Sequence, residues 1–311
     1  VDIVVAFPKV STRSDQAHEA LLTDYAVNGR RSLNHARRRV NLGLLPWFQG
    51  RRMAHITPDD VQLYVEQRQR GGAANATINR ELAALKRMFS LAIKRGRLFY
   101  GPYIPLLHEN NIRQGFFERE QFEALRGHLP AELRGLVTLA YYTGWRMQSE
   151  VFPLRWPQVD RQVGTIRLEP GTTKNSDGRT FAYAEIGELR QAIETQWREH
   201  QSLRQSEIIC PWVFHRNGRP IKSLTRAWRA ACKAAGCPGR VPHDFRRTAV
   251  RNMERAGVPR KVAMTLVGHR TEAMYRRYDI VTDGDLHDAA AKIESAATVT
   301  KTVTINRSAA G

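Results

Sequence analysis

Apolar residues in the first hundred positions recur at the spacing of helix faces. The clearest stripe lies between residues 76 and 95, where three- and four-residue steps join Ile78, Leu82, Leu85, Met88, Phe89 and Ala92. A stripe with this period indicates an amphipathic helix that buries one face. Similar patterns predict four helices in this half of the chain: Gln16–Val27, Leu33–Phe48, Pro58–Gln69 and Ala76–Arg95.

Local chemistry marks the ends of the third of these helices. Thr57 offers a capping hydroxyl, Pro58 suits the first turn, and Asp59 and Asp60 complement the positive end of the helix dipole. The Gly-Gly pair at 71–72 follows as a stop. The third helix is therefore expected to begin directly after Thr57.

The helical pattern stops around residues 101–115, where Gly-Pro-Tyr-Ile-Pro and Glu-Asn-Asn are turn and linker sequences. We place a domain boundary here. The prediction is a helical domain over 1–105, a linker over 106–115 and a second domain over 116–285, followed by a tail over 286–311.

The second domain mixes helices with short strands. Its pattern predicts helices over 118–129 and 131–142 and strands over 156–160, 164–168 and 180–186, with a turn at 175–178 between the last two strands. Further helices are expected from 187 to 278, interrupted by an apolar run at 208–214, and the tail shows a helical pattern at 285–296 and a strand-like one at 298–305. The expected fold class is mainly α with a small antiparallel β-sheet (α+β).

Composition describes a globular protein whose leading partner is nucleic acid. Apolar residues make up 42% and charged residues 25% of the 311 positions, and the net charge is +19. Residues 1–105 carry 17 basic and 8 acidic side chains, so both halves share the positive charge, which favours a duplex gripped from two sides. Candidate DNA contacts are basic residues of the fourth helix, mostly off its apolar stripe, and one residue of the second domain: Arg80, Lys86, Arg87, Lys94 and Arg247.

The sequence shows neither a membrane-spanning segment nor a metal-binding pattern. No apolar run approaches the ~18 residues of a membrane span, and the first residues lack the pattern of a signal peptide, so we expect a cytoplasmic, DNA-associated protein. Cys210, Cys232 and Cys237 are too few and too unevenly spaced for a disulfide framework or a four-ligand zinc site. We interpret them as reduced structural residues and expect no metal.

Residues able to hold a phosphate and attack it are concentrated near the end of the chain. Arg246 can direct two donors at phosphate oxygens, His243 and His269 can exchange protons near neutral pH, and Tyr278 carries a nucleophilic phenol oxygen. Taken alone, the stretch that starts at His243 also fits an ordinary basic helix. A Tyr-Thr-Gly-Trp-Arg segment that ends at Arg146 favours the functional interpretation, because it adds a second arginine.

Together these motifs resemble the tyrosine recombinases, the phage integrase family, over roughly residues 15–285. The similar segments are Thr77-Ile78-Asn79-Arg80-Glu81-Leu82 with Phe89, Thr143-Gly144-Trp145-Arg146, His243-Asp244-Phe245-Arg246-Arg247-Thr248, Leu266-Val267-Gly268-His269 and Arg277-Tyr278. The resemblance implies a helical DNA-clamp domain followed by the catalytic domain. It also implies an enzyme that cleaves and rejoins DNA without metal, ATP or another cofactor.

The resemblance assigns a role to each candidate residue. Tyr278 would attack a DNA phosphodiester, forming a 3′-phosphotyrosyl link and a free 5′ hydroxyl. Arg146 and Arg246 would hold the nonbridging oxygens. The remaining roles are hydrogen bonding to the phosphate by His243 and His269, with His243 the better candidate for taking the tyrosine proton, and protonation of the leaving 5′ oxygen by Lys174, which follows Thr173.

Three positions leave alternatives open. Tyr275 lies about one helical turn before the proposed nucleophile, although the spacing from the Gly-His pair favours the later tyrosine. Arg179 could replace Lys174 as the cationic donor, but a guanidinium, with a pKa above ~12, is a poor acid. Glu150 lies four residues after Arg146, whereas the commoner family spacing is three. It either orients an arginine, if a local bulge absorbs the extra residue, or is a surface acid.

The leading hypothesis is a site-specific DNA recombinase that acts as a homotetramer on two duplexes with specific half-sites. In recombinases of this kind the tail commonly packs on a neighbouring protomer; folding back on its own domain, or disorder, is the alternative. A type IB topoisomerase-like enzyme shares the chemistry but needs one protomer, and a non-catalytic DNA-binding protein needs only the basic charge. A metal-dependent nuclease would need clustered carboxylates or a histidine doublet, which the sequence lacks.

Overall fold

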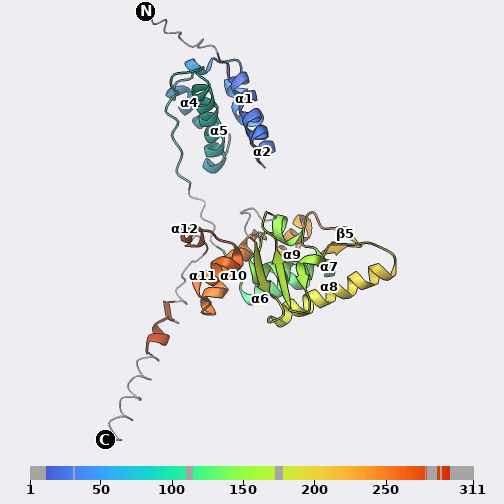
Figure 1. The fold of residues 1–311 in the computed structure, drawn as a ribbon. Helices are drawn as coiled ribbons and strands as arrows, with labels where there is room; N and C mark the ends of the chain where they lie inside the picture. The colour runs from blue at the N-terminus through green and yellow to red at the C-terminus, as the bar shows by residue number, and fades with distance from the viewer. Residues whose placement is uncertain are drawn as a thin grey trace, which may run out of the picture. The chain divides into compact units, whose positions relative to one another are not determined.

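The computed structural model describes residues 12–30, 32–109, 115–171, 178–276, 278, 286–287 and 289–294. The chain divides into two compact units, Val1–Arg113 and Gln114–Gly311, and each unit has its own hydrophobic core (Figure 1). The helices of the described segments include none that is both long and apolar enough to cross a membrane.

The first unit is helical in its described residues. Its elements are α1 (Ser14–Val27), α2 (Leu33–Arg39), the π-helical turn η1 (Val40–Leu44), α3 (Leu45–Phe48), the 3-10 turn η2 (Met53–His55), α4 (Pro58–Arg70) and α5 (Asn75–Lys94). The α5 stripe is buried, as its period predicted, and Thr57 caps α4 by accepting from the Asp60 backbone N–H at 3.2 Å. The apolar stripe of α5 and the capping residue of α4 were therefore enough to predict these two helices from the sequence.

The helix predicted over 33–48 is continuous in the structure, as α2, η1 and α3, and its middle turn η1 is π-helical. A Cβ on Gly43 would lie 2.8 Å from the carboxylate of Glu81, so glycine lets this turn approach α5 closely. Glu81 is itself buried and accepts hydrogen bonds from Tyr64 at 2.6 Å and from Arg68 at 2.8 and 3.0 Å. The predicted bounds are those of the helical segment, but its π-helical middle turn, which accompanies a tertiary contact, was not predicted.

The segment after α5 is tied back to that helix. The Asn79 side-chain amide donates to the Leu107 carbonyl at 2.8 Å and accepts from the Leu107 N–H at 2.8 Å. Asn75 donates to the carbonyl of His108 at 2.9 Å. Residues 107 and 108, which the sequence placed in the linker, therefore hydrogen-bond to the first unit.

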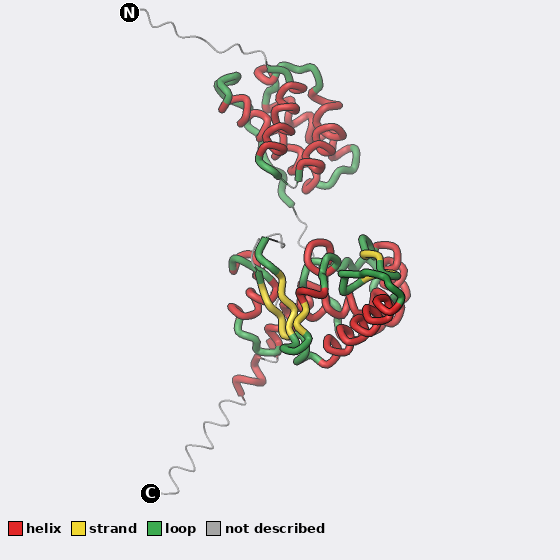
Figure 2. Tube along the Cα trace, turned by 45° about the vertical axis from the view of Figure 1, so that its right-hand side comes forward, coloured by secondary structure: helices red, strands yellow, loops and turns green. Residues whose placement is uncertain are grey.

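The second unit packs helices against a three-stranded antiparallel sheet in the order β1-β2-β3, which Figure 2 shows in yellow. Its elements are α6 (Arg119–His128), α7 (Ala131–Thr143), the π-helical turn η3 (Met147–Val151), the 3-10 turn η4 (Trp156–Gln158), β1 (Val159–Asp160), β2 (Thr165–Leu168), β3 (Arg179–Ala182), α8 (Gly187–Gln205), β4 (His215–Arg216), β5 (Arg219–Pro220), α9 (Thr225–Ala234), α10 (Asp244–Arg255), α11 (Arg260–Val267) and α12 (Glu272–Arg276). The mainly α fold with small antiparallel sheets confirms the predicted fold class.

Helix α7 lies between the two ends of this unit and contacts both α8 and α10. In Figure 1 the long helix α8 runs toward one end, and α10, α11 and α12 gather at the other. On the sheet, Ile166 of β2 pairs with Val159 and with Phe181, and Ile166 and Phe181 are buried in the core. The sheet thus fixes the position of β3, whose first residue is Arg179.

Two details of the second unit differ from the prediction. The strand predicted over 156–160 begins as the η4 turn, in which Pro157 has no N–H to give a neighbouring strand, so only the last two residues pair. The β4–β5 hairpin was missed. Its turn is an Asn-Gly pair, Asn217 at φ 50° and Gly218 at φ 75°, which is a recognisable hairpin signal.

The tail is described only in part. Residues 286–287 and 289–294 are helical and exposed, within the segment predicted to be helical. The strand-like segment at 298–305 and residues 172–177, which include Lys174, lie outside the described residues. Docking of the tail on a neighbouring protomer stays a prediction.

Candidate active site

Helix ends bring the separated motifs of the second unit together. Gly144 ends α7 at φ 63° and Gly268 ends α11 at φ 71°, both in the left-handed region that favours glycine. His243 is the N-cap residue of α10, which places Arg246 in the first turn of that helix. Because α10 packs on both α7 and α11, the Arg146 segment and the His243 segment meet here.

Arg246 lies at the centre of the site and is only 2% exposed. Its Nε donates to His269 Nε2 at 3.0 Å, Nη1 donates to the Gly144 carbonyl at 2.9 Å, and Nη2 donates to the Gly268 carbonyl at 3.4 Å. A guanidinium has five N–H donors, so the bonds among the described residues leave one donor on each Nη atom. Burial, with the nearby charge of Arg146, lowers the pKa of Arg246 to about 10, and the side chain stays cationic at neutral pH.

The hydrogen bond that Arg246 donates determines which ring nitrogen of His269 carries the proton. Because Nε2 accepts this hydrogen bond, we assign the proton of the neutral ring to Nδ1. Burial and the charge of Arg246 lower the pKa of His269 to about 3, so the ring is neutral at pH 7. It stacks on the ring of Tyr278, with centroids 4.8 Å apart and an angle of 26°.

The Tyr278 hydroxyl lies 3.2 Å from His243 Nε2, a hydrogen-bonding distance between a candidate nucleophile and a candidate base. The half-buried ring is also close to two guanidinium groups, with Arg246 Cζ 5.9 Å and Arg247 Cζ 5.8 Å from its centroid. Tyr275, by contrast, is fully buried and its hydroxyl donates to Glu254 Oε1 at 2.7 Å. The geometry favours the later tyrosine, as the motif spacing did.

A pH dependence follows from the environment of His243. Partial desolvation and the charge of Arg246 lower the pKa of this histidine, so it is neutral near pH 7 and can accept the phenolic proton of Tyr278. We expect the single-turnover rate of DNA cleavage to be level near neutral pH and to decline only below the ordinary histidine value of ~6.5. A rate profile measured at saturating DNA checks this. A decline that begins well above that value would contradict the assignment, and His243→Gln should remove the acidic limb.

The extra residue between Arg146 and Glu150 is absorbed by the π-helical turn η3. Glu150 Oε1 accepts from Arg146 Nη1 at 2.7 Å, and Oε2 accepts from the Arg146 backbone N–H at 2.7 Å. The Glu150 side chain is fully buried, so the alternative of a surface acid is wrong. Burial alone would raise the pKa of Glu150, but the charge of Arg179 and the backbone bond outweigh it and the pKa is lowered.

Arg179 is a buried residue of the site whose contacts were not predicted from the sequence. It was weighed against Lys174 as a proton donor, but its side chain is 2% exposed and its Nη2 lies 2.5 Å from Glu150 Oε2. A period-two burial pattern in β3 was the available signal, since Arg179 shares a face with Phe181. The position of Lys174 stays a prediction.

The DNA-binding candidates fall into two groups. Arg80, Lys86 and Lys94 are exposed on α5. The other two are engaged within the protein. Arg87 pairs with Asp24 at 2.9 and 3.1 Å, and Arg247 is only 8% exposed and lies beside the Tyr278 ring. The first three stay predictions as phosphate contacts, and the last two are less available for that role.

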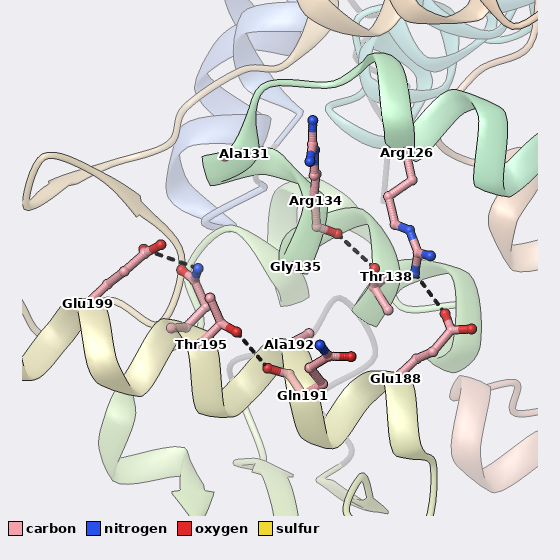
Figure 3. Close-up of a pocket in the computed structure, with 11 residues that line it drawn as sticks. Arg126, Ala131, Arg134, Gly135, Thr138, Glu188, Gln191, Ala192, Thr195 and Glu199 are labelled. Carbon is pink, nitrogen blue, oxygen red and sulfur yellow. Dashed lines mark hydrogen bonds and ion pairs between the residues drawn. The ribbon is translucent and has the colours of Figure 1, made fainter.

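A separate groove of about 460 Å³ lies between α6, α7 and α8 (Figure 3). Arg126 pairs with Glu188 there at 2.7 Å, and small residues such as Gly135 and Ala192 line its sides. None of its lining residues belongs to the arginine, histidine and tyrosine grouping. Within the described segments, no group of three or more His, Cys, Asp or Glu residues is placed to hold a metal ion, and the three cysteines are free and buried.

Residues 116–284 match the model of the phage integrase family, and residues 31–96 match that of the phage integrase N-terminal SAM-like domain. The chain belongs to the phage integrase family. Membership confirms the resemblance and the prediction of a tyrosine-type site-specific recombinase.

Solved structures of integrases share this fold. A lambda integrase dimer bound to a COC′ core site has a TM-score of 0.72 at 16% identity, covering 88% of this chain and 78% of that one. A lambda integrase tetramer bound to a Holliday junction has a TM-score of 0.69 at 16% identity, covering 88% and 80%. The Tn1549 transposon integrase in complex with a circular intermediate DNA has a TM-score of 0.69 at 15% identity, covering 89% and 99%. A search of curated proteins found no match.

Proposed function

We propose that this integrase cleaves and rejoins DNA through a 3′-phosphotyrosine formed on Tyr278, with no metal ion or ATP in the reaction. The observation that carries the proposal is the 3.2 Å contact between the Tyr278 hydroxyl and His243 Nε2. The same tyrosine ring stacks on His269, which accepts a hydrogen bond from Arg246. Nucleophile, base and phosphate clamp are thus contiguous.

In the proposed reaction a DNA phosphodiester binds against the free N–H groups of Arg246 and against Arg146. The Tyr278 oxygen attacks phosphorus while His243 Nε2 takes the phenolic proton. The bond from phosphorus to the 5′ oxygen breaks, and that oxygen takes a proton, for which Lys174 is the proposed donor. The two guanidinium groups stabilise the negative charge that gathers on the nonbridging oxygens.

Rejoining reverses these steps. A phosphodiester is exchanged for a phosphotyrosyl ester, so the bond energy is retained and a 5′ hydroxyl can attack the link without ATP. The proposed substrate is double-stranded DNA with specific half-sites, bound by a homotetramer. Support comes from the net charge of +19 and from lambda integrase, which has been solved as a dimer on a core site and as a tetramer on a Holliday junction.

The test is a library of nicked duplexes with randomised half-sites, incubated with the protein in excess chelator. The nick lets the cleaved end diffuse away and traps the covalent intermediate. We expect a protein–DNA adduct that resists detergent, and sequencing of the trapped DNA should reveal inverted half-sites. An adduct that appears only after a divalent metal is added would contradict the metal-independent mechanism. DNA that is bound but never cleaved would favour the non-catalytic alternative.

A further inference from the structure

We propose that Arg179 is a positioning residue, which holds Arg146 and Arg246 in place through Glu150 and Gly268. The part of this inference that concerns cleavage rests on the proposed function. Arg179 begins β3, and its side chain is 2% exposed, with its guanidinium packed against Glu150 and Gly268. Its contacts lie behind the two arginines of the phosphate clamp.

The first contact fixes Arg146. The buried Glu150 carboxylate lies between two guanidinium groups, with Arg179 Nη2 2.5 Å from Oε2 and Arg146 Nη1 2.7 Å from Oε1. Arg146 is 18% exposed, whereas Arg179 is almost wholly enclosed. A carboxylate that is ion-paired on one side with a strand residue gives the more exposed arginine a fixed partner. Arg179 therefore orients Arg146 indirectly, through the Glu150 carboxylate.

The second contact fixes the turn that supports Arg246. A Cβ on Gly268 would clash with Arg179 Nη1, so the guanidinium packs directly on the backbone of this residue. The carbonyl of Gly268 accepts from Arg246 Nη2 at 3.4 Å, and His269 comes next in the chain. The ring of Trp145, whose centroid is 5.5 Å from Arg179 Cζ, lies beside the guanidinium. One buried cation thus contacts the supports of both clamp arginines.

The positive charge of Arg179 favours the same arrangement of the site as its contacts do. The positive charge of Arg179 adds to burial and to the charge of Arg246 in lowering the pKa of His269, which favours the neutral ring that accepts from Arg246. Loss of Arg179 would also leave Glu150 with one cation instead of two. Removing one partner from a buried ionic group is costly, because the remaining charge stays out of water.

The experiment compares Arg179→Met with Arg167→Met. Arg167 lies on the neighbouring strand β2, is exposed, and pairs only at the surface with Glu169 at 3.3 Å, so it is a matched control. On a trapped cleavage substrate, Arg179→Met should slow covalent adduct formation by about 10- to 100-fold, as loss of an orienting partner does at other sites. The Kd for uncleaved DNA should stay unchanged, and Arg167→Met should match the wild type.

A double-mutant cycle with Glu150→Gln separates positioning from folding. If Arg179 acts through Glu150, its replacement should slow the reaction less in the Glu150→Gln background than in the wild type. The Glu150→Gln/Arg179→Met protein replaces the buried carboxylate with a neutral amide, so it should unfold less readily than Arg179→Met alone. Additive effects would overturn the inference. So would a lower Tm and adduct yield with an unchanged rate constant for the folded fraction.

A second readout keeps this inference apart from the proposed function. Absence of any adduct with the wild type would count against phosphotyrosine chemistry, but not against the positioning role. That role is then judged from the side-chain Nε–H NMR signals of Arg146 and Arg246. Both signals should move in Arg179→Met and stay in place in Arg167→Met, and unchanged signals in Arg179→Met would refute the positioning role.

Discussion

Tyr278→Phe should abolish the covalent protein–DNA adduct, lowering the rate of its formation by about 10⁴-fold or more, as expected when a covalent nucleophile is removed. The substitution deletes one oxygen and keeps the ring. The stack on His269 and the neighbouring guanidinium groups of Arg246 and Arg247 should therefore persist, and folding and DNA affinity should be retained. Gel analysis of the trapped substrate after detergent treatment measures the adduct.

Tyr275→Phe is the matched control for this variant. It removes a hydroxyl three residues earlier, which donates to Glu254 at 2.7 Å and lies in a fully buried side chain. We expect a loss of about 1–2 kcal/mol in the free energy of unfolding, from one hydrogen bond, with adduct formation retained. If the adduct persisted in Tyr278→Phe and vanished in Tyr275→Phe, the nucleophile would be misassigned.

Features encoded by neighbouring residues were predictable from the sequence. The cap at Thr57 depends on contacts within one turn, and the apolar stripe of α5 is a repeat within a single helix, so both can be recognised from consecutive residues. The order of the Arg146, His243, His269 and Tyr278 motifs, taken with the helical first domain and the short strands, was likewise enough to suggest the family, which the family model confirms. Their meeting in space depends on the two glycine turns at Gly144 and Gly268.

Features that depend on tertiary contacts were harder to predict. The spacing of Glu150 raised the question of a bulge, but only the packing of β3 shows why a carboxylate is needed there, since Arg179 reaches it from a different element. The close approach at Gly43 is similar, because the group that it faces, the Glu81 carboxylate, lies on another helix. A buried arginine cannot be distinguished from a surface arginine by its own position in the sequence. Its burial is decided by residues far along the chain.

Arg246→Lys should lower the rate of adduct formation by about 10²- to 10³-fold, because an ammonium keeps the charge but cannot replace the planar fork. The guanidinium bonds to two carbonyls and to His269 while keeping donors for the phosphate. A lysine must leave some of these buried acceptors unpaired, each at a cost of about 1–3 kcal/mol. The Tm should therefore fall together with the rate, and a control for stability is required.

Arg251→Lys supplies that control, since it changes another buried arginine of α10. Arg251 donates to Glu118 at 2.6 Å and to the Phe117 carbonyl at 3.2 Å, and no bond that it makes among the described residues involves the site. It should lower the Tm comparably while the rate constant per folded molecule stays at the wild-type value. Measuring both variants at a temperature where each is folded isolates the chemistry. An Arg246→Lys protein that cleaves as fast as Arg251→Lys would show that charge alone suffices and that the fork geometry does not matter.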